Sequence, residues 1–520
     1  MVNSLGRELP EFIGGYRVRP YQGLETAEST AVPVQSKRIV ERCQAGQSKL
    51  LGSLKEALLA CGLKDGMTIS FHHSFREGDL VVGQVMEAIG ELGIKNLRFA
   101  PSAVVNLKNF SLAKYVEDGT ITRVEASGIR GELGDRLIDG SVQMDEPAIL
   151  RPHGARPRAI ETGELEIDVA FIAVSASDVY GNCTGQIGTN RCGSLGYSFV
   201  DAHNANKVVV ITDTLVDYPC CPASISQQYV DYVVKVDQVG DSAKIGAGAA
   251  RLTKNPRDLM IAQKVVKVIA ASRRFADGFS FQTGAGAISI ACTKFLAEEM
   301  EKKQVKASFA LGGITAAIID MYDAGLVRVV ECSQSFDATA ASAILSRPGV
   351  LEIDNADYSN AFNKGNFLNH LNFGVLGALE VDTDFNVNLL TSSSGKMMGG
   401  LGGGPDVAAG ADISIVTLPI VRGRTPSVVD RVFTCCTPGE TVACVVTQAG
   451  IALNPRHRNY AELREDLERA GIKPVDIQEL RRLAEELTGR PEPIKTTQRI
   501  VAVVQYRDGT VVDVVREVAF

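Results

Sequence analysis

Short apolar runs alternate with segments of helical periodicity along most of this chain. The apolar run over 67–71 is followed by an amphipathic pattern over 81–93 and by a second apolar run over 96–104. Runs of this length with branched side chains are typical of buried strands, and the pattern between them is typical of a helix. The strand–helix–strand order predicts a parallel sheet, because parallel strands need a crossover between them.

The alternation continues on both sides of a small, polar segment at 241–250, where a domain boundary is expected. Asn255-Pro256 then begins a helix, with an N-cap residue and a proline at the first helical position. Before the boundary, the pattern predicts a helix over 49–61 and strands over 168–175, 208–212 and 233–236. After it, the pattern predicts helices over 256–276, 288–302, 314–323, 460–470 and 476–487, strands over 307–311, 326–331, 375–379 and 413–416, and a final hairpin turning at Asp508-Gly509.

These elements predict the α/β fold class, with two open, mostly parallel sheet domains and an N-terminal arm. Residues 1–47 lack sustained periodicity and are expected to form an extended arm that lies over the body or over a neighbour. The first domain is expected to span 48–245 and the second 246–520. A chain of 520 residues is too long for one hydrophobic core, which also favours two large domains.

A short internal repeat indicates that the two domains are related. Asp178 and Asn182 stand four residues apart after one apolar strand, and Asp382 and Asn386 do the same after another. Each pair is followed by glycines, an aspartate beside small residues, and a further apolar strand. A match over so few positions is also expected by chance between two β–loop–α–β units, but the order of the parts agrees.

Charge and cysteine usage limit the classes of function. The net charge of −7 argues against binding to nucleic acid or to an anionic membrane. The eleven cysteines form no C-x-x-C pair, and no histidine pair has helical metal-ligand spacing, so no metal site is expected. The first 23 residues contain no apolar signal core, and no apolar run approaches membrane-spanning length, so a cytoplasmic location is expected.

A glycine-rich loop at 395–410 separates two apolar strands, and seven of its sixteen residues are glycine. Glycine loses more conformational entropy on folding than other residues, so such a cluster needs a reason. Exposed backbone N–H groups of Gly402, Gly403 and Gly404 could stabilise a negatively charged oxygen in a reaction. The alternative is an ordinary tight connection or a lid without chemistry.

Cationic and imidazole side chains follow two of the predicted strands. His72, His73 and Arg76 come directly after the strand at 67–71, and ligands in parallel sheets bind at the carboxyl ends of strands. Arg422 and Arg424 follow a later strand and could hold carboxylates in bidentate fashion. These five residues are predicted to bind an anionic substrate; the alternative is a buried core histidine and arginines on the molecular rim.

A second glycine-containing loop, Gln282-Thr-Gly284-Ala-Gly286, begins a predicted helix. The N–H groups at a helix N-terminus could hold a phosphate or an acyl oxygen. The loop lacks the third glycine of a dinucleotide-binding fingerprint, so a nicotinamide or flavin cofactor is not expected.

Several segments together resemble the citrate lyase alpha-subunit family of CoA-transferases. The resemblance covers nearly all of the chain after about residue 50 and is carried by the glycine loop together with the segments DGMTISFHHSFREGD (65–79), CGSLGYSFVDA (192–202), KVDQVGDSAKIGAGA (235–249), ALGGIT (310–315), ALEVDTDFNVN (378–388) and IVRGRTPSVVD (420–430). The resemblance implies a CoA-transferase fold with its site between two domains.

The resemblance also implies an activity and partners. The expected reaction is citrate CoA-transfer, in which acetyl-acyl-carrier-protein and citrate give citryl-acyl-carrier-protein and acetate. No cofactor would be permanently bound, since the thiol belongs to a phosphoribosyl-dephospho-CoA group on a separate gamma subunit, the acyl carrier. A beta subunit would cleave the citryl thioester, and this chain alone would form a homo-oligomer, a dimer. Gln282, Gly284, Gly286 and Asp406 are the expected contacts of the CoA-like group.

One departure from many CoA-transferases concerns the covalent nucleophile. Those enzymes carry a glutamate after a strand of the second domain, and the register set by Asp320 and Ala324-Gly325 puts its position at Gly312, beside Gly313. The chain thus resembles the branch without a covalent glutamate, in which citrate attacks the acetyl thioester directly. Glu331 and Glu380, each at a strand end, are the alternative nucleophiles.

Two other functions compete with this hypothesis. The first is an acetate- or hydroxyacyl-CoA:CoA transferase that uses free CoA and a covalent glutamate. The second is a non-catalytic subunit, either a ligand-sensing domain or a scaffold for a lyase complex. The acidic balance and the absence of a basic segment argue against a DNA-binding sensor.

Overall fold

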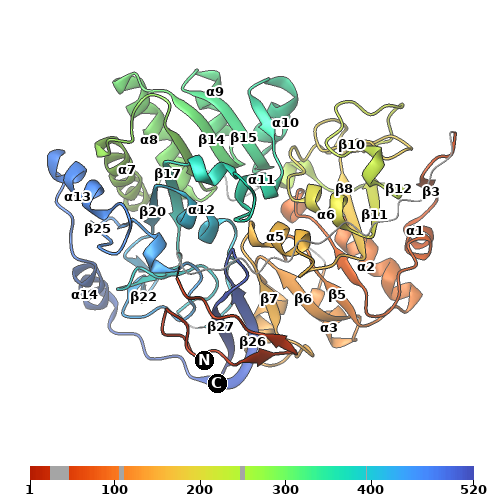
Figure 1. Cartoon of the computed structure of the whole chain (residues 1–520), viewed down its shortest axis with the longest axis horizontal. Coiled ribbons are helices and arrows are strands. Elements are labelled where there is room, and N and C mark those ends of the chain that lie inside the picture. Colours follow the sequence, from red (N-terminus) through yellow and green to blue (C-terminus); the bar gives the residue numbers. More distant parts are fainter. Residues whose placement is uncertain (24–45, 105–109, 246–251, 394, 520) are drawn as a thin grey trace.

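Two β-sheets, each covered by helices, lie side by side in the computed structural model of the chain (Figure 1). The structure describes residues 1–23, 46–104, 110–245, 252–393 and 395–519. Most strand pairs within both sheets are parallel, so the predicted α/β class with mostly parallel sheets is confirmed. Residues 246–250 of the predicted domain boundary and residues 24–45 of the predicted arm lie outside the described residues.

The first sheet has ten strands, and only its terminal pair is antiparallel. Its helices are α1 (Leu54–Ala60), α2 (Val81–Leu92), α3 (Leu112–Glu117), α4 (Glu132–Ile138), α5 (Ala155–Glu161) and α6 (Ser198–Asn204). The sheet contains, in order, β27 (Val511–Val518), β26 (Thr496–Gln505), β7 (Ala148–Leu150), β6 (Ile121–Ala126), β5 (Leu97–Phe99), β4 (Thr68–Ser70), β8 (Val169–Val174), β11 (Lys207–Thr212), β12 (Tyr232–Lys235) and β3 (Leu50–Leu51).

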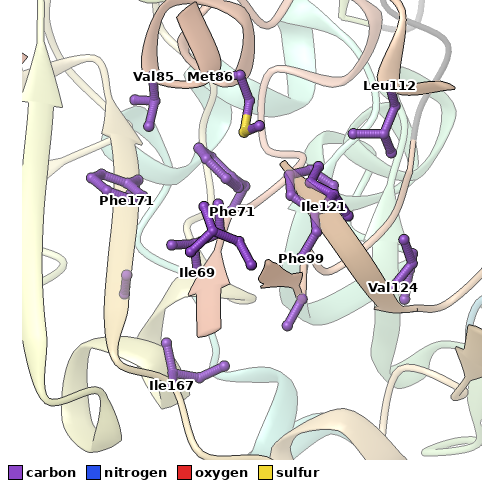
Figure 2. Packing of buried hydrophobic residues seen from close by; sticks show 14 of the residues in the cluster. Ile69, Phe71, Val85, Met86, Phe99, Leu112, Ile121, Val124, Ile167 and Phe171 are labelled. Carbon is purple, nitrogen blue, oxygen red and sulfur yellow. The ribbon is translucent and has the colours of Figure 1, made fainter. Parts of the chain in front are cut away.

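The core of this sheet is built from the apolar runs that predicted its strands. Figure 2 shows Phe71 between Phe171 and Phe99, with ring centroids 5.4 Å and 5.3 Å away. Val85 and Met86 of α2 cover the same cluster, and both are fully buried. Burial of these large side chains fixes the carboxyl end of β4, from which the chain continues into the candidate site.

The second sheet has eight strands, of which only β24 and β25 pair antiparallel. Its helices are α7 (Pro256–Ala271), α8 (Ala287–Lys303), α9 (Ala316–Asp323), α10 (Ala338–Ser346), α11 (Asn355–Ser359), α12 (Gly404–Gly410), α13 (Tyr460–Arg469) and α14 (Ile477–Thr488). The sheet contains, in order, β16 (Val350–Glu352), β15 (Val327–Ser335), β14 (Ala307–Ile314), β13 (Ser280–Thr283), β17 (Phe373–Gly377), β20 (Ile413–Thr417), β24 (Cys444–Val446) and β25 (Ile451–Leu453).

Short strands form small two- or three-stranded sheets outside the two large ones. They are β1 (Phe12–Ile13) with β2 (Tyr16–Arg17), β9 (Ala176–Ser177) with β10 (Cys183–Thr184), β21 (Val421–Arg422) with β22 (Thr425–Pro426), and β18 (Glu380–Asp382) with β19 (Val387–Asn388) and β23 (Val428–Val429).

The start of the first helix differs from the prediction. The helical periodicity suggested a start at residue 49, but Leu50 and Leu51 form β3, which pairs with β12. The helix begins only at Leu54, because the Ser53 side chain caps it by accepting a hydrogen bond from the Glu56 N–H at 3.2 Å. Pairing with an existing sheet edge satisfies the backbone of two leucines that periodicity alone assigned to the helix.

The C-terminal hairpin is confirmed, but it lies in the first sheet. β26 runs parallel to β7, with Val503 opposite Ile149, although the prediction assigned residues 246–520 to the second domain. The chain therefore returns to the first half after completing the second (Figure 1). Such long-range pairing leaves no trace in a local pattern, which explains why the prediction missed it.

The described part of the N-terminal arm lies on this hairpin. Asn3 Nδ2 donates to the Val512 carbonyl at 2.7 Å, and Pro20 forms a bridge with Val511. Leu9 and Ile13 pack in one cluster with apolar side chains of β26 and β27. The first and last segments of the chain are thus side by side, which agrees with the predicted arm over the body.

The internal repeat has a structural counterpart. Asp178 Oδ1 accepts hydrogen bonds from three following N–H groups, and its Oδ2 accepts from Asn182 Nδ2 at 2.8 Å. Asp382 Oδ1 accepts from the N–H groups of residues 384 and 386, and its Oδ2 accepts from Asn386 Nδ2 at 3.1 Å. The two halves therefore use the same aspartate–asparagine loop after equivalent strands.

Candidate functional site

A cleft of about 380 Å³ lies between the two halves, and residues from both line it. The glycine loop forms one wall, and the segment after β4 belongs to the opposite half. Of the predicted site residues, the cleft brings together His73, Arg76, Gln282, Gly284, Gly313, Gly402, Gly403 and Gly404.

The glycine loop is tied to the first half by backbone hydrogen bonds. Leu401 N–H donates to the Ser127 carbonyl at 2.7 Å, and the Gly402 carbonyl accepts from His153 N–H at 2.9 Å. A β-carbon on Gly128 would lie 2.4 Å from Gly400 Cα, so the two backbones meet where no side chain fits. The loop is therefore a fixed wall of the cleft.

Gly312 and Gly313 lie within β14, which continues past the predicted end of the strand. A register shift between them marks an irregularity, and Gly312 has φ +102°. A β-carbon on Gly313 would fall 1.9 Å from the Phe336 ring. Both positions thus require glycine for steric reasons, and neither can supply a nucleophilic side chain.

Three rings form a cluster on the first half's side of the cleft, in which His73 and Tyr197 are buried and His153 is half-buried. The His73 ring centroid is 4.6 Å from that of Tyr197, and the Tyr197 hydroxyl lies 2.6 Å from His153 Nδ1. Burial, then the neighbouring His153 and Arg76, lower the pKa of His73 well below its usual value. Burial, then Arg130 and Arg76, lower the pKa of His153 to about 3. Both imidazoles are therefore neutral at pH 7 and can serve as hydrogen-bonding groups without adding charge.

His72 does not line this cleft and instead faces a buried ion pair. Its Nε2 lies 3.0 Å from Asp201 Oδ2, and Arg156 makes a bidentate pair with the same carboxylate at 2.5 Å and 2.7 Å. Ser70 Oγ also donates to Asp201 at 2.5 Å. Burial alone would raise the pKa of Asp201, but Arg156 and His72 outweigh it, so this pKa is below its ordinary value. The network joins β4, α5 and α6 under the cleft.

Two arginines give the cleft a positive wall. The Arg76 guanidinium lies 4.8 Å from the Phe336 ring centroid, a cation–π arrangement, and its nearest carboxylate is Glu77 at 3.5 Å. Arg130 also lines the cleft, and no carboxylate of the described residues forms an ion pair with it. Burial, then Arg76, lower the pKa of Arg130. Two cations so close together, with one weak counterion, favour binding of an anion.

Asp406 lies behind the glycine loop and not in the cleft. It is fully buried in α12, and its Oδ2 accepts from Gly154 N–H at 2.8 Å. Arg507 Nε is 3.8 Å from its Oδ1. Burial outweighs Arg507 and raises the pKa of Asp406 to about 7. Its contacts connect the glycine loop to α5 and to the C-terminal hairpin.

The remaining predicted residues lie outside the cleft lining. Gly286 caps α8, and Arg422 and Arg424 are exposed on the β21–β22 hairpin, where Arg422 donates to the Ala378 carbonyl at 3.1 Å. Glu331 is buried in β15 with its Oε2 unbonded among the described residues. Glu380 accepts hydrogen bonds from Asn388 Nδ2 at 3.0 Å and Ser393 Oγ at 2.6 Å, the pattern of a structural carboxylate.

The cleft also contains polar residues that the sequence reasoning missed. His153 follows β7 by three residues, so the strand-end argument that found His73 could have found it as well. Arg130 comes four residues after β6, so the same argument could have found it too. Tyr358 lies on the short helix α11, which a strand-end argument does not reach. Tyr197 comes just before α6, in a segment that the sequence reasoning used only to identify the family.

Neither metal chemistry nor membrane insertion is indicated by the described part of the chain. Within it, no group of three or more His, Cys, Asp or Glu side chains is placed to hold a metal ion. No helix there is both long and apolar enough to cross a bilayer.

The fold and the cleft define an α/β protein with two parallel sheets and a ligand site at their junction, lined by glycine backbone and arginine side chains. The sequence model of the family "Citrate lyase, alpha subunit (CitF)" matches residues 47–518, and the chain belongs to this family. The citrate lyase alpha chain of Escherichia coli K12 is 46% identical over 502 residues, which are 96% of this chain and 97% of that protein. The alpha chain of Klebsiella pneumoniae is 46% identical over 499 residues, or 96% of each chain.

One solved structure supports the same assignment, and a second shares the fold. An alpha subunit of citrate lyase from Streptococcus mutans, solved in complex with citrate, matches with a TM-score of 0.95 and 43% identity over 100% of both chains. A Pseudomonas malonate decarboxylase hetero-tetramer matches with a TM-score of 0.63 over 85% of this chain and 86% of that chain. Its 17% identity shows a shared fold only.

Proposed function

We propose that this chain is a citrate CoA-transferase, which exchanges acetyl for citryl on an acyl-carrier thioester. The observation that carries this proposal is the cleft, in which glycine backbone faces a pair of arginines between two sheets. Membership of the citrate lyase alpha-subunit family gives the reaction, and a relative of 43% identity has been solved with citrate bound. The net reaction converts acetyl-carrier and citrate into citryl-carrier and acetate.

Citrate is expected to bind on the arginine side of the cleft. Arg76 and Arg130 supply two positive charges for the carboxylates, and guanidinium groups match carboxylates in geometry. The neutral imidazole of His73 beside them can exchange hydrogen bonds with a hydroxyl or a carboxylate. Arg422 and Arg424 are not needed for this arrangement, since both lie outside the cleft lining.

The acyl thioester is expected to enter along the glycine side. Its thiol belongs to a phosphoribosyl-dephospho-CoA group on a gamma subunit, which supplies the activated acyl group. Gln282 fits the amide-bearing arm of such a group, because its side chain is 8% exposed, lines the cleft and has an Oε1 without a partner among the described residues. Gly284, two residues further along the chain, also lines the cleft and has no side chain to shield its backbone from a ligand there.

The reaction follows from these positions as two acyl transfers. A citrate carboxylate oxygen attacks the acetyl carbonyl carbon, the carbonyl electron pair moves onto oxygen, and collapse expels the thiolate to leave a mixed anhydride. The thiolate then attacks the citryl carbonyl of the anhydride, and acetate leaves. The Gly404 N–H donates to the Leu401 carbonyl at 3.2 Å, so Gly402 and Gly403 are the loop residues whose N–H groups can stabilise the negative oxygen in both steps. Such stabilisation is usually the largest single contribution in acyl transfer.

Other subunits complete the cycle in this proposal. A beta subunit cleaves the citryl thioester, and the gamma subunit carries the acyl group between the two sites. The alpha chain alone is expected to form a homodimer, and the whole assembly to work in the cytoplasm.

The purified chain, given acetyl-carrier protein and citrate, is expected to release acetate and form citryl thioester but no oxaloacetate. Acetate and oxaloacetate can be measured enzymatically, and the carrier by intact mass. The matched control omits citrate, and no acetate should then appear beyond slow hydrolysis. Failure to form citryl thioester would contradict the proposed function, and oxaloacetate from the pure chain would contradict the division of labour.

Sequential kinetics are expected, because Gly312 and Gly313 offer no group to acylate. Both substrates must then be bound together, so initial rates with citrate and acetyl-carrier varied should give intersecting lines. Peptide mass analysis after incubation with acetyl-carrier alone should find no modified glutamate. Parallel lines together with a thiol adduct on Glu331 or Glu380 would favour the covalent alternative instead.

A further inference from the structure

The hydroxyl of Tyr358 stands between the two glycine segments of the cleft. Tyr358 lies on α11, lines the cleft and is 4% exposed. A β-carbon on Gly403 would lie 3.1 Å from the Tyr358 hydroxyl oxygen, and one on Gly312 would lie 3.3 Å from it. These two glycines belong to different segments of the second half, the glycine loop and β14. One phenolic oxygen therefore contacts both places where side chains are missing.

This hydroxyl has no hydrogen-bond partner in the described part of the chain, whereas other tyrosine hydroxyls of the protein are engaged. The Tyr197 hydroxyl bonds with His153 Nδ1 at 2.6 Å, and the Tyr322 hydroxyl accepts from Gly349 N–H at 3.1 Å. A buried phenol ordinarily finds a partner. Its free donor, in a cleft lined by glycine backbone, is available to a ligand.

The helix that carries Tyr358 is held firmly at both ends. Asp354 caps α11, with its Oδ1 accepting from Ala356 N–H at 2.8 Å, and Asn355 N–H donates to the Gly196 carbonyl of the first half at 3.0 Å. At the other end, Arg507 Nη2 donates to the Ser359 carbonyl at 3.3 Å. Such a donor needs little reorganisation during a reaction, which is what makes a preorganised group effective.

We propose that Tyr358 is a catalytic hydrogen-bond donor, whose hydroxyl stabilises the negative oxygen that forms when an acyl carbonyl is attacked in this cleft. The inference rests on the proposed acyl exchange. When citrate attacks the acetyl carbonyl, the carbonyl electron pair moves onto oxygen, and the phenolic O–H donates to that oxygen without transferring its proton. When the thiolate leaves, the pair returns to the carbonyl and the hydrogen bond weakens. The same donation serves the attack of the thiolate on the citryl carbonyl.

The phenol remains protonated over the working pH range. Burial, followed by Asp406 and Tyr197, raises the pKa of Tyr358 well above its usual value. A donor of this kind complements the backbone N–H groups of the glycine loop, since oxyanion sites commonly combine backbone and side-chain donors.

The test is Tyr358→Phe in the full-length chain, assayed with acetyl-carrier and citrate. The phenylalanine ring fills the same space, so loss of the donor should lower kcat by about 100-fold, as removal of one oxyanion donor does, with little change in KM or thermal midpoint. The matched control is Tyr506→Phe, which removes another buried, unpartnered hydroxyl outside the cleft lining. It should leave kcat unchanged.

Each outcome decides one claim. If wild-type protein forms no citryl thioester, the proposed function fails; if wild type is active and Tyr358→Phe keeps its kcat, the catalytic role of Tyr358 fails. A loss confined to KM or shared by Tyr506→Phe would also overturn it. Should Tyr358→Phe not fold, 3,5-difluorotyrosine at 358, a more acidic phenol, replaces it. The alkaline loss of kcat should then begin at lower pH, and an unchanged pH profile would refute the role.

Discussion

Substituting valine for Gly403 should lower turnover about a thousand-fold, the upper part of the range measured for loss of one oxyanion donor. Gly403 has φ −91°, a conformation that any residue can adopt, so the change introduces little backbone strain. The new side chain would instead enter the cleft, since a β-carbon there already lies 3.1 Å from the Tyr358 hydroxyl. It would separate the reacting carbonyl from both the loop N–H groups and Tyr358. Steady-state rates of citryl-carrier formation measure the effect.

The matched control for this substitution is Gly365→Val. Gly365 is an exposed loop glycine with open space around its Cα and without a positive φ, so it accepts a side chain equally well. That variant should retain wild-type turnover, and both variants should unfold at the wild-type temperature. Near-full activity of Gly403→Val would show that the glycine loop is only a connection between β19 and α12.

Strands could be predicted where burial and sequence pattern coincide. The run that became β8 is apolar on both faces, as expected for a strand covered by helices on each side, and all six of its residues are buried. β3 and the position of β26 were not predictable in this way. Both depend on which sheet edge remains free after the rest of the chain has folded, and that is a property of the tertiary structure.

The sequence could predict those site residues that directly follow a strand. His73 and Arg76 reach the cleft because they follow β4, and the strand-end argument requires no further knowledge. His72 also follows β4 directly, but its side chain points away from the cleft, because successive side chains near a strand alternate in orientation. The sequence could not reveal that Asp201 lies on that other side, 129 residues later in the chain, nor that burial keeps Asp406 out of the cleft.

The place of Tyr358 in the cleft could not be predicted from any local sequence pattern. Its helix is five residues long and carries no periodicity that a sequence pattern could detect. The position of this helix follows from its contacts with the Gly196 carbonyl and with Arg507. Both residues belong to the half of the molecule that contains the first sheet. A residue placed by the junction of two domains becomes visible only when both domains are in place.

The buried ion pair under the cleft leads to the largest expected change in stability. Arg156→Met should lower the free energy of unfolding by about 3–5 kcal/mol, because it leaves Asp201 charged and buried without its cation. Arg156 is 5% exposed and Asp201 is fully buried, so water cannot replace the lost partner. Urea unfolding followed by circular dichroism measures the change. The matched control is Arg482→Met, which breaks an exposed pair with Glu486 and should cost less than about 1 kcal/mol.

The pH dependence identifies the origin of this effect. The folded-state pKa of Asp201 is depressed, so the ion pair contributes fully above the unfolded-state pKa of about 3.9 and is lost as the pH falls through the lower folded-state pKa. Wild type and Arg156→Met share the same unfolded state, but in the variant Asp201 stays buried without its arginine, which raises its folded-state pKa. The difference between the two proteins should therefore be largest near neutral pH and shrink as the pH falls through the raised pKa of the variant. Adding Asp201→Asn to Arg156→Met should recover part of the loss at pH 7, because the uncompensated charge is removed. A loss as small as that of Arg482→Met, or one unaffected by the second substitution, would show that the network under the cleft contributes by packing and not by charge.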